Sequence, residues 1–146
     1  MNAHILPIAN VNYLDHIFTD FKLKIMPAAF YEQIPQEHLA LWCHNNGIYG
    51  LPTTELIDWL RLQITPKTIE IGSGNGAIGR ELGIPTTDSC FMRRPDVALL
   101  YTLQGQPTTK YPDDIEELSA VDAIEKYQPE VVIGCWVTHK YREDEH

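Results

Sequence analysis

The chain has 146 residues, 44% of them hydrophobic, which predicts one globular domain with a single sizeable core. Its 20 acidic and 11 basic side chains give a formal net charge of -9, which disfavours a nucleic-acid partner and favours a small molecule or a protein. The three cysteines are far apart and fit neither a zinc site nor a disulfide framework, so we expect free thiols and a cytoplasmic location.

Two further features of the sequence concern membranes and metals. Residues 1–16 lack the regions of an export signal, and no run approaches the ~18 apolar residues of a membrane span, so we expect no membrane association. His38 and His44 lie near Glu37 and Cys43, which is a weak hint of metal ligation. Because no set of three or four ligands follows from this spacing, no required metal is expected.

The first part of the chain, residues 1–40, is expected to be an irregular segment that covers the rest. Prolines separate its short apolar clusters, and only one strand, near residues 21–26, is indicated. A helix over residues 39–46 should then end at Gly47, and a second helix, capped by Thr53 or Thr54, should end before Pro66.

The strongest pattern in the chain is TIEIGSGNGAIGREL at residues 68–82. Its β-branched start predicts a buried parallel strand, and its end predicts a helix. Between them, Gly72, Gly74 and Gly76 permit positive φ and let a ligand approach the backbone, while the helix directs free amides into the same space. The stretch therefore predicts a nucleotide-cofactor pocket.

Glu70, two residues before the first glycine, helps to choose the cofactor. Its carboxylate would repel a pyrophosphate ~6 Å away by roughly 3 kcal/mol at an effective dielectric constant of ~20. A cofactor with an ammonium group and no phosphate avoids this repulsion, because the ammonium can face Glu70 while a carboxylate faces the helix amides. S-adenosylmethionine has both groups.

Downstream, predicted strands alternate with helices. Residues 84–88 indicate a second strand, residues 115–118 a third and residues 130–137 a fourth, and residues 120–127 indicate a helix. The apolar stretch VALLYTL fits either a strand or one face of a helix, and the sequence leaves that choice open. The alternation predicts right-handed crossovers and a ligand crevice at the carboxyl ends of parallel strands.

The sequence Glu70-Ile71-Gly72-Ser73-Gly74-Asn75-Gly76 resembles the first motif of the class I, Rossmann-like S-adenosylmethionine-dependent methyltransferases, an acid followed by G-x-G-x-G. The resemblance covers roughly residues 49–139. It implies an α/β fold, a Rossmann-like three-layer sandwich with a mostly parallel sheet, and makes residues 41–146 a methyltransferase-like domain. It also implies that the first motif binds the cofactor through Glu70, Gly72, Ser73, Gly74 and Gly76.

The same resemblance assigns roles to residues beyond the later strands. Asp88 matches the acid that binds the ribose hydroxyls, and Glu117 and Leu118 occupy the stretch near the adenine. His139, after the fourth strand, is a candidate general base for the methyl acceptor. From the residues alone, Asp88 can instead be a turn or cap residue, Glu117 a helix-start residue and His139 an ordinary polar residue.

Other interpretations of the glycine motif stay open. Residues 74–79 also satisfy the dinucleotide pattern G-x-G-x-x-G, and a glycine-rich turn can bind nothing. Only seven residues follow His139, so the family's fifth strand and terminal hairpin have no sequence and the sheet is expected to be incomplete. The N-terminal segment or a second copy of the chain could cover the fourth strand, or the chain could be a truncated relative. We favour the first two together and expect a homodimer.

We therefore predict a protein that resembles S-adenosylmethionine-dependent methyltransferases, with a small molecule or a protein as methyl acceptor. The motifs of the base-methylating enzymes are missing from the sequence, so the acceptor stays open. One alternative is a noncatalytic module that binds S-adenosylmethionine or S-adenosylhomocysteine, or that binds another protein. A second alternative is an NAD-binding protein.

Overall fold

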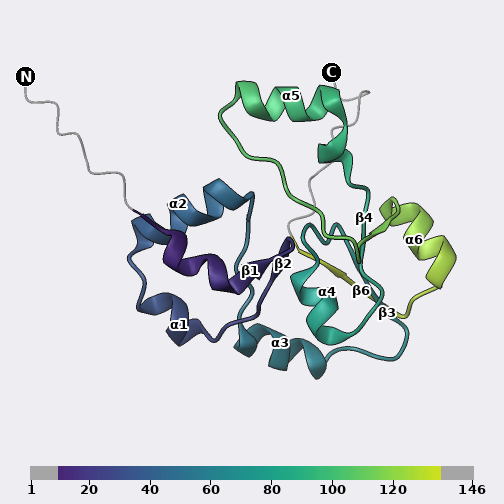
Figure 1. Cartoon of the computed structure of the whole chain (residues 1–146). Helices are drawn as coiled ribbons and strands as arrows, with labels where there is room; N and C mark the ends of the chain where they lie inside the picture. The colour runs from purple at the N-terminus through teal and green to yellow at the C-terminus, as the bar shows by residue number, and fades with distance from the viewer. Residues whose placement is uncertain (1–9, 136–146) are drawn as a thin grey trace, which may run out of the picture.

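The structure, a computed structural model, describes residues 10–135 and is a mixed α/β fold (Figure 1). Its N-terminal part, on the left in Figure 1, holds a 3-10 helix, an antiparallel hairpin and two α-helices. These elements are η1 (Asn12–Ile17), β1 (Phe18–Thr19), β2 (Lys22–Leu23), α1 (Ala28–Glu32) and α2 (Gln36–Asn46). The segment expected to be irregular thus contains regular structure from residue 12 onward.

A small apolar core holds this N-terminal part together. Trp42 of α2 is buried with Leu14 and Ile17 of η1, and its indole Nε1 donates to Asp15 Oδ1 at 2.9 Å. The predicted end of α2 is confirmed, because Gly47 follows it with a left-handed φ of 67°. The helix runs without a break across residues 40 and 41, so the division predicted at residue 40 falls inside it.

The next helix, α3 (Thr54–Arg61), joins this part to the rest of the chain. It begins as predicted, because Thr53 Oγ1 accepts the amide of Leu56 at 3.2 Å. Its buried Ile57 and Leu60 belong to a second apolar cluster, which also includes side chains of α4 (Ala77–Leu82) and β6 (Val131–Gly134). The predicted helix therefore contributes directly to the core beneath the glycine motif.

Four short parallel strands form the centre of the second part: β3 (Thr68–Ile71), β4 (Thr87–Asp88), β5 (Glu116–Glu117) and β6. β3 pairs with β6, and β4 pairs with β5, both in parallel. A parallel bridge between Glu70 and Thr86 joins the two pairs, which gives the order β5-β4-β3-β6. Among the described strands, only β3 pairs with β6. The α/β class and the parallel strands are confirmed.

Helices make the connections between these strands. α4 links β3 to β4, the 3-10 turn η2 (Phe91–Arg93) and α5 (Pro95–Leu103) link β4 to β5, and α6 (Ala120–Tyr127) links β5 to β6. The stretch VALLYTL, left open by its pattern, is therefore helical. α5 stands apart from the sheet in Figure 1 and buries none of its residues. No helix in residues 10–135 combines the length and the apolar content that crossing a membrane requires.

Candidate functional site

The glycine loop, defined here as residues 72–76, makes a tight turn at the carboxyl end of β3. Gly72, Gly74 and Gly76 have φ values of 56°, 59° and 76°, so the predicted left-handed conformations are confirmed. The amide of Ser73 donates to the Thr87 carbonyl at 3.0 Å, which ties the loop to β4. The loop then leads directly into the first turn of α4.

The glycines near the loop meet different surroundings. A Cβ on Gly76 would overlap Ile115 Cδ1, and a Cβ on Gly79 in α4 would overlap Thr86 Oγ1, so a larger residue at either position would force its neighbours to shift. Gly74 is different, because its Cβ would lie 3.7 Å from Thr109 Cγ2, an ordinary contact distance. A methyl group at Gly74 would therefore touch the Thr109 side chain without overlapping it.

Glu70 lies beneath the loop, against α4. Its side chain is 2% exposed, and its Oε1 accepts the amide of Gly79 at 3.0 Å. Burial raises the pKa of this carboxyl from its ordinary value of 4.5 to about 7, although the hydrogen bond from Gly79 opposes the shift. The role predicted for Glu70, facing a cofactor's ammonium, stays a prediction. Because the carboxyl is only partly ionised at neutral pH, its repulsion of a phosphate is weaker than the sequence suggested.

Asp88, at the end of β4, holds the glycine loop from the side. Its Oδ2 accepts the amide of Gly74 at 2.8 Å, and its Oδ1 accepts the amide of Cys90 at 2.7 Å. The side chain is largely buried, so these are hydrogen bonds to a shielded carboxylate. The structure thus brings Asp88 to the central glycine of the motif, as the predicted crevice at the strand ends requires.

The other predicted cofactor residues lie on the neighbouring strand. Asp88 is paired with Glu117 in the β4–β5 register, and the amide of Leu118 donates to the Asp88 carbonyl at 3.0 Å. Glu117 is exposed, while Leu118 is half-buried. The loop, Asp88, Glu117 and Leu118 therefore share one edge of the sheet. His139 lies outside the described residues.

A segment that the sequence analysis did not single out covers the loop. This segment, residues 106–111, is called the strap below. Its Thr109 lies over Gly74, and the amide of Thr109 donates to Met92 Sδ at 3.2 Å. At its other end the Tyr49 hydroxyl donates to the Pro107 carbonyl. The strap therefore connects the residues after α2 to the glycine loop.

An ion pair fastens the chain just after the strap to the same loop. The Arg80 guanidinium donates from Nε to Asp114 Oδ2 at 2.6 Å and from Nη2 to Asp114 Oδ1 at 2.8 Å. The same Nη2 donates to the Asn75 carbonyl at 2.8 Å. These bonds to Arg80 hold the pKa of Asp114 below its usual range. The pair stabilises the loop in its present shape, because one guanidinium bonds both to the Asn75 carbonyl in the loop and to Asp114.

Two buried polar atoms beside the loop make no hydrogen bond within residues 10–135. They are the Ser73 hydroxyl oxygen and Arg80 Nη1. A buried donor or acceptor without a partner costs free energy, typically about 1–3 kcal/mol. A ligand or a water molecule could supply the missing hydrogen bond to such an atom. Ser73 lies within the predicted cofactor motif.

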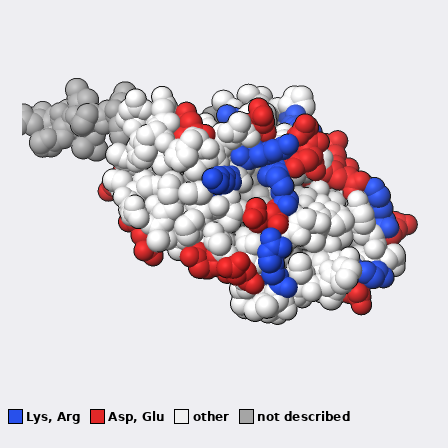
Figure 2. All heavy atoms as spheres, turned by 60° about the horizontal axis from the view of Figure 1, so that its bottom comes forward, with Lys and Arg blue, Asp and Glu red and all other residues white. Residues whose placement is uncertain are grey.

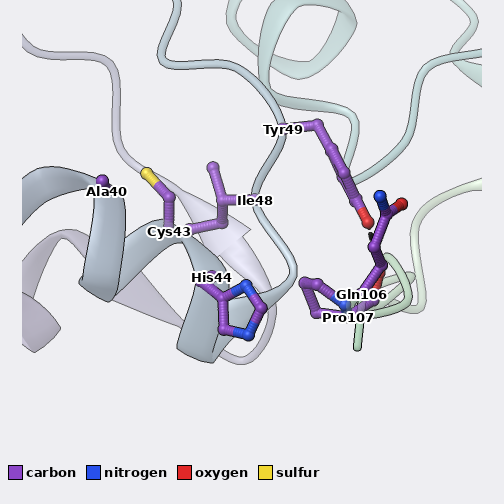
Figure 3. A pocket seen from close by; sticks show the side chains of 7 residues that line it. All are labelled: Ala40, Cys43, His44, Ile48, Tyr49, Gln106 and Pro107. Atoms are coloured by element: carbon purple, nitrogen blue, oxygen red, sulfur yellow. Dashed lines mark hydrogen bonds between the residues drawn. The ribbon is translucent and has the colours of Figure 1, made fainter. Parts of the chain in front are cut away.

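A hollow, the α2 pocket, lies between α2 with the residues after it and the strap (Figure 3). Its volume is about 290 Å³. Two segments line it, α2 with the residues after it and the strap: Ala40, Cys43, His44, Ile48, Tyr49, Gln106 and Pro107. Sequence reasoning missed this pocket, because its two walls are about sixty residues apart and neither carries a motif.

Cysteine chemistry and metal binding find little support around these sites. Cys43, Cys90 and Cys135 are free thiols, as expected. Burial raises the pKa values of Cys43 and Cys90 to about 11, so both thiols stay neutral at physiological pH. In the described part of the chain, no three His, Cys, Asp or Glu side chains come together in a way that could hold a metal ion.

The charged side chains on the face shown in Figure 2 are mixed in sign. Lys and Arg lie among Asp and Glu rather than forming an unbroken basic surface. Two ion pairs near the strap illustrate this mixing, Arg80 with Asp114 and Lys22 with Asp113. This distribution gives no support to binding along a nucleic-acid backbone.

The chain was also compared with known proteins. No protein-family model matches it, and the comparisons found no matching curated protein and no matching solved structure.

Proposed function

We propose that the chain binds S-adenosylmethionine at the glycine loop and is a methyltransferase-like protein. The observation that carries this proposal is that the glycine loop follows β3, the strand that lies between β4 and β6. The chain continues from β3 to β4 on one side, whereas β6 lies on the other side. In open parallel sheets, ligands bind at such a change of direction, outside the carboxyl ends of the strands.

The strand order supports a Rossmann-like three-layer sandwich as the fold behind this site. Numbered along the chain, the four parallel strands lie in the order third, second, first, fourth. This is the order of the corresponding strands in dinucleotide-binding sheets. We propose that the described part of the sheet follows that plan.

In this proposal, the residues of the loop and of β4 hold the cofactor. The Ser73 hydroxyl, which has no partner in the described residues, would bind a polar group of the ligand. Asp88 keeps lone pairs beyond the two amides it accepts and would receive the ribose hydroxyls. Glu117 and Leu118 would lie beside the adenine. Gly72 and Gly74 would let the ligand contact the backbone, whereas Gly76 would shape the turn, because Ile115 fills the space beside it.

Methyl transfer would then be a direct displacement, for which the protein aligns acceptor and cofactor. S-adenosylmethionine supplies the electrophilic methyl group. His139 is our proposal for the general base that receives the acceptor's proton. The acceptor is proposed to be a small molecule or a protein. A cytoplasmic location belongs to the same proposal, as does a homodimer through the edge of β6 that no described strand covers.

Two other functions each have an observation in their favour. A noncatalytic binding module is favoured by the strap, because Thr109 lies over Gly74 and narrows the space for an acceptor. An NAD-binding protein is favoured by the pKa of Glu70, about 7, because a partly neutral carboxyl tolerates a nearby phosphate better.

A thermal-shift comparison of S-adenosylhomocysteine with NAD tests the proposal. At about 100 times its dissociation constant, a ligand stabilises the native state by about 2.7 kcal/mol, so S-adenosylhomocysteine should raise Tm. Gly74→Val should abolish that rise. Gly83→Val is the matched control, because Gly83 has a similar φ of 70° and open space around its Cβ. A rise with NAD alone would refute the proposal.

A further inference from the structure

The α2 pocket is a second candidate for ligand binding, separate from the glycine loop. Figure 3 shows α2 and the residues after it on one side and Gln106 and Pro107 of the strap on the other. Its volume of about 290 Å³ suits a small molecule with a single ring. The pocket therefore has the size of a ligand site although no motif marks it.

The walls of the pocket are held in place by the fold itself. The carbonyl of Thr108 lies so close to Gly47 that a Cβ there would overlap it, which fixes the strap against the end of α2. The Tyr49 hydroxyl adds a hydrogen bond to the Pro107 carbonyl. Burial and the neighbouring Tyr101 phenol raise the pKa of Tyr49, so this hydroxyl keeps its proton. Such a pocket is formed before any ligand arrives.

The chemistry of the lining indicates an uncharged ligand. None of the described lining residues is Asp, Glu, Lys or Arg, and the Cys43 thiol is neutral at physiological pH. Ile48 and Pro107 supply apolar surface, and the His44 and Tyr49 rings supply flat surfaces for stacking. The Gln106 amide can both donate and accept a hydrogen bond. No lining carboxylate would pair with a cation, and the formal net charge of -9 on the chain disfavours an anion.

We infer that the α2 pocket binds a small uncharged ring compound that carries a hydroxyl group. The ring would lie against Ile48 and Pro107, and the hydroxyl would bond to the Gln106 amide. This site does not depend on S-adenosylmethionine binding, because none of its lining residues belongs to the glycine loop.

Titrating the ¹⁵N-labelled chain with phenol, and separately with benzoate, tests this inference. Phenol should shift the backbone amides of Gly47, Ile48 and Gln106 with a dissociation constant of about 1 mM, a normal affinity for so small a ligand. Benzoate has the same ring but carries a negative charge, so it should bind about 10-fold more weakly or less. Equal responses to the two compounds, or no saturable shift with phenol, would overturn the inference.

A pair of alanine variants localises the binding. Ala40 lines the pocket and is exposed, so Ala40→Phe should fill the space and abolish the phenol shifts. Ala120→Phe is the control, because Ala120 is an equally exposed alanine at the start of α6 and should leave phenol binding unchanged. Phenol shifts that persist in Ala40→Phe would contradict the site. Should Ala40→Phe fail to fold, the comparison of phenol with benzoate on the unaltered chain decides.

Discussion

The glycine loop and the α2 pocket both contact the strap, and they are built in different ways. At the glycine loop, glycines in left-handed conformations, a buried carboxyl and the two amides bonded to Asp88 fix the backbone tightly. At the α2 pocket, both exposed and buried side chains from distant segments surround an open space. A local motif can therefore mark a site through its backbone, whereas a pocket made by tertiary packing leaves no such pattern in the sequence.

The largest expected effect on stability comes from a substitution at the contact between the strap and the end of α2. Gly47→Ala places a Cβ onto the Thr108 carbonyl and strains a left-handed backbone, so we expect a loss of about 4 kcal/mol in the free energy of unfolding. Gly105→Ala is the control, because Gly105 has a φ of 68° and open space around it, and only the strain of about 1 kcal/mol is expected. Urea unfolding measures both. Equal losses would show that the strap is not held against Gly47.

The second prediction concerns Glu70 and pH. Its pKa of about 7 in the folded chain exceeds the ordinary value of 4.5, so the folded state binds more protons between these pH values. The free energy of unfolding should therefore fall as pH rises through this window, by about 3 kcal/mol in total from this group. Glu70→Gln keeps an oxygen for the Gly79 amide but cannot ionise.

Urea unfolding of both proteins at pH 4 and pH 8 makes the comparison. The free energies of unfolding of the variant and the unaltered chain should differ less at pH 4 than at pH 8. At pH 8 the variant should be the more stable of the two. The same pH dependence in both proteins would mean that Glu70 does not titrate in the folded chain as we describe.

A smaller effect is expected where Asp88 holds the loop. Asp88→Asn leaves one oxygen for the two amides of Gly74 and Cys90, so one hydrogen bond to a charged group is lost, typically about 2 kcal/mol. In Asp88→Asn, hydrogen exchange should become faster at the amide of Gly74 or of Cys90, whichever loses its acceptor. It should stay unchanged at the Leu118 amide, which bonds to the Asp88 main-chain carbonyl. Unchanged exchange at both Gly74 and Cys90 would contradict the role given to Asp88.

Much of the fold follows from local sequence. The helices over residues 77–82 and 120–127 have the predicted bounds, because their start and end signals lie within a few residues of each helix. The strands at 68–71, 87–88, 116–117 and 131–134 lie within predicted segments. VALLYTL could not be assigned, because a helix that is apolar all round shows no helical period and looks like a buried strand.

The site was only partly predictable. The positive φ values of Gly72 and Gly74 follow from the motif, and the position of Asp88 beside the loop follows from the alternation of strands and helices. The direction of the Glu70 side chain depends on which face of the sheet carries α4, and the strap depends on a contact between Tyr49 and Pro107, far apart in sequence. Neither relation is encoded in a short stretch of residues.

The measurement that tests the central claim most directly is a titration of the ¹⁵N-labelled chain with S-adenosylhomocysteine, followed at the amides of the glycine loop. We predict saturable shifts at Gly72, Ser73, Gly74 and Gly76, with the amides around the α2 pocket much less affected. NAD at the same concentrations should leave the loop amides unchanged. Loop amides that respond to NAD and not to S-adenosylhomocysteine, or to neither, would contradict the proposed function.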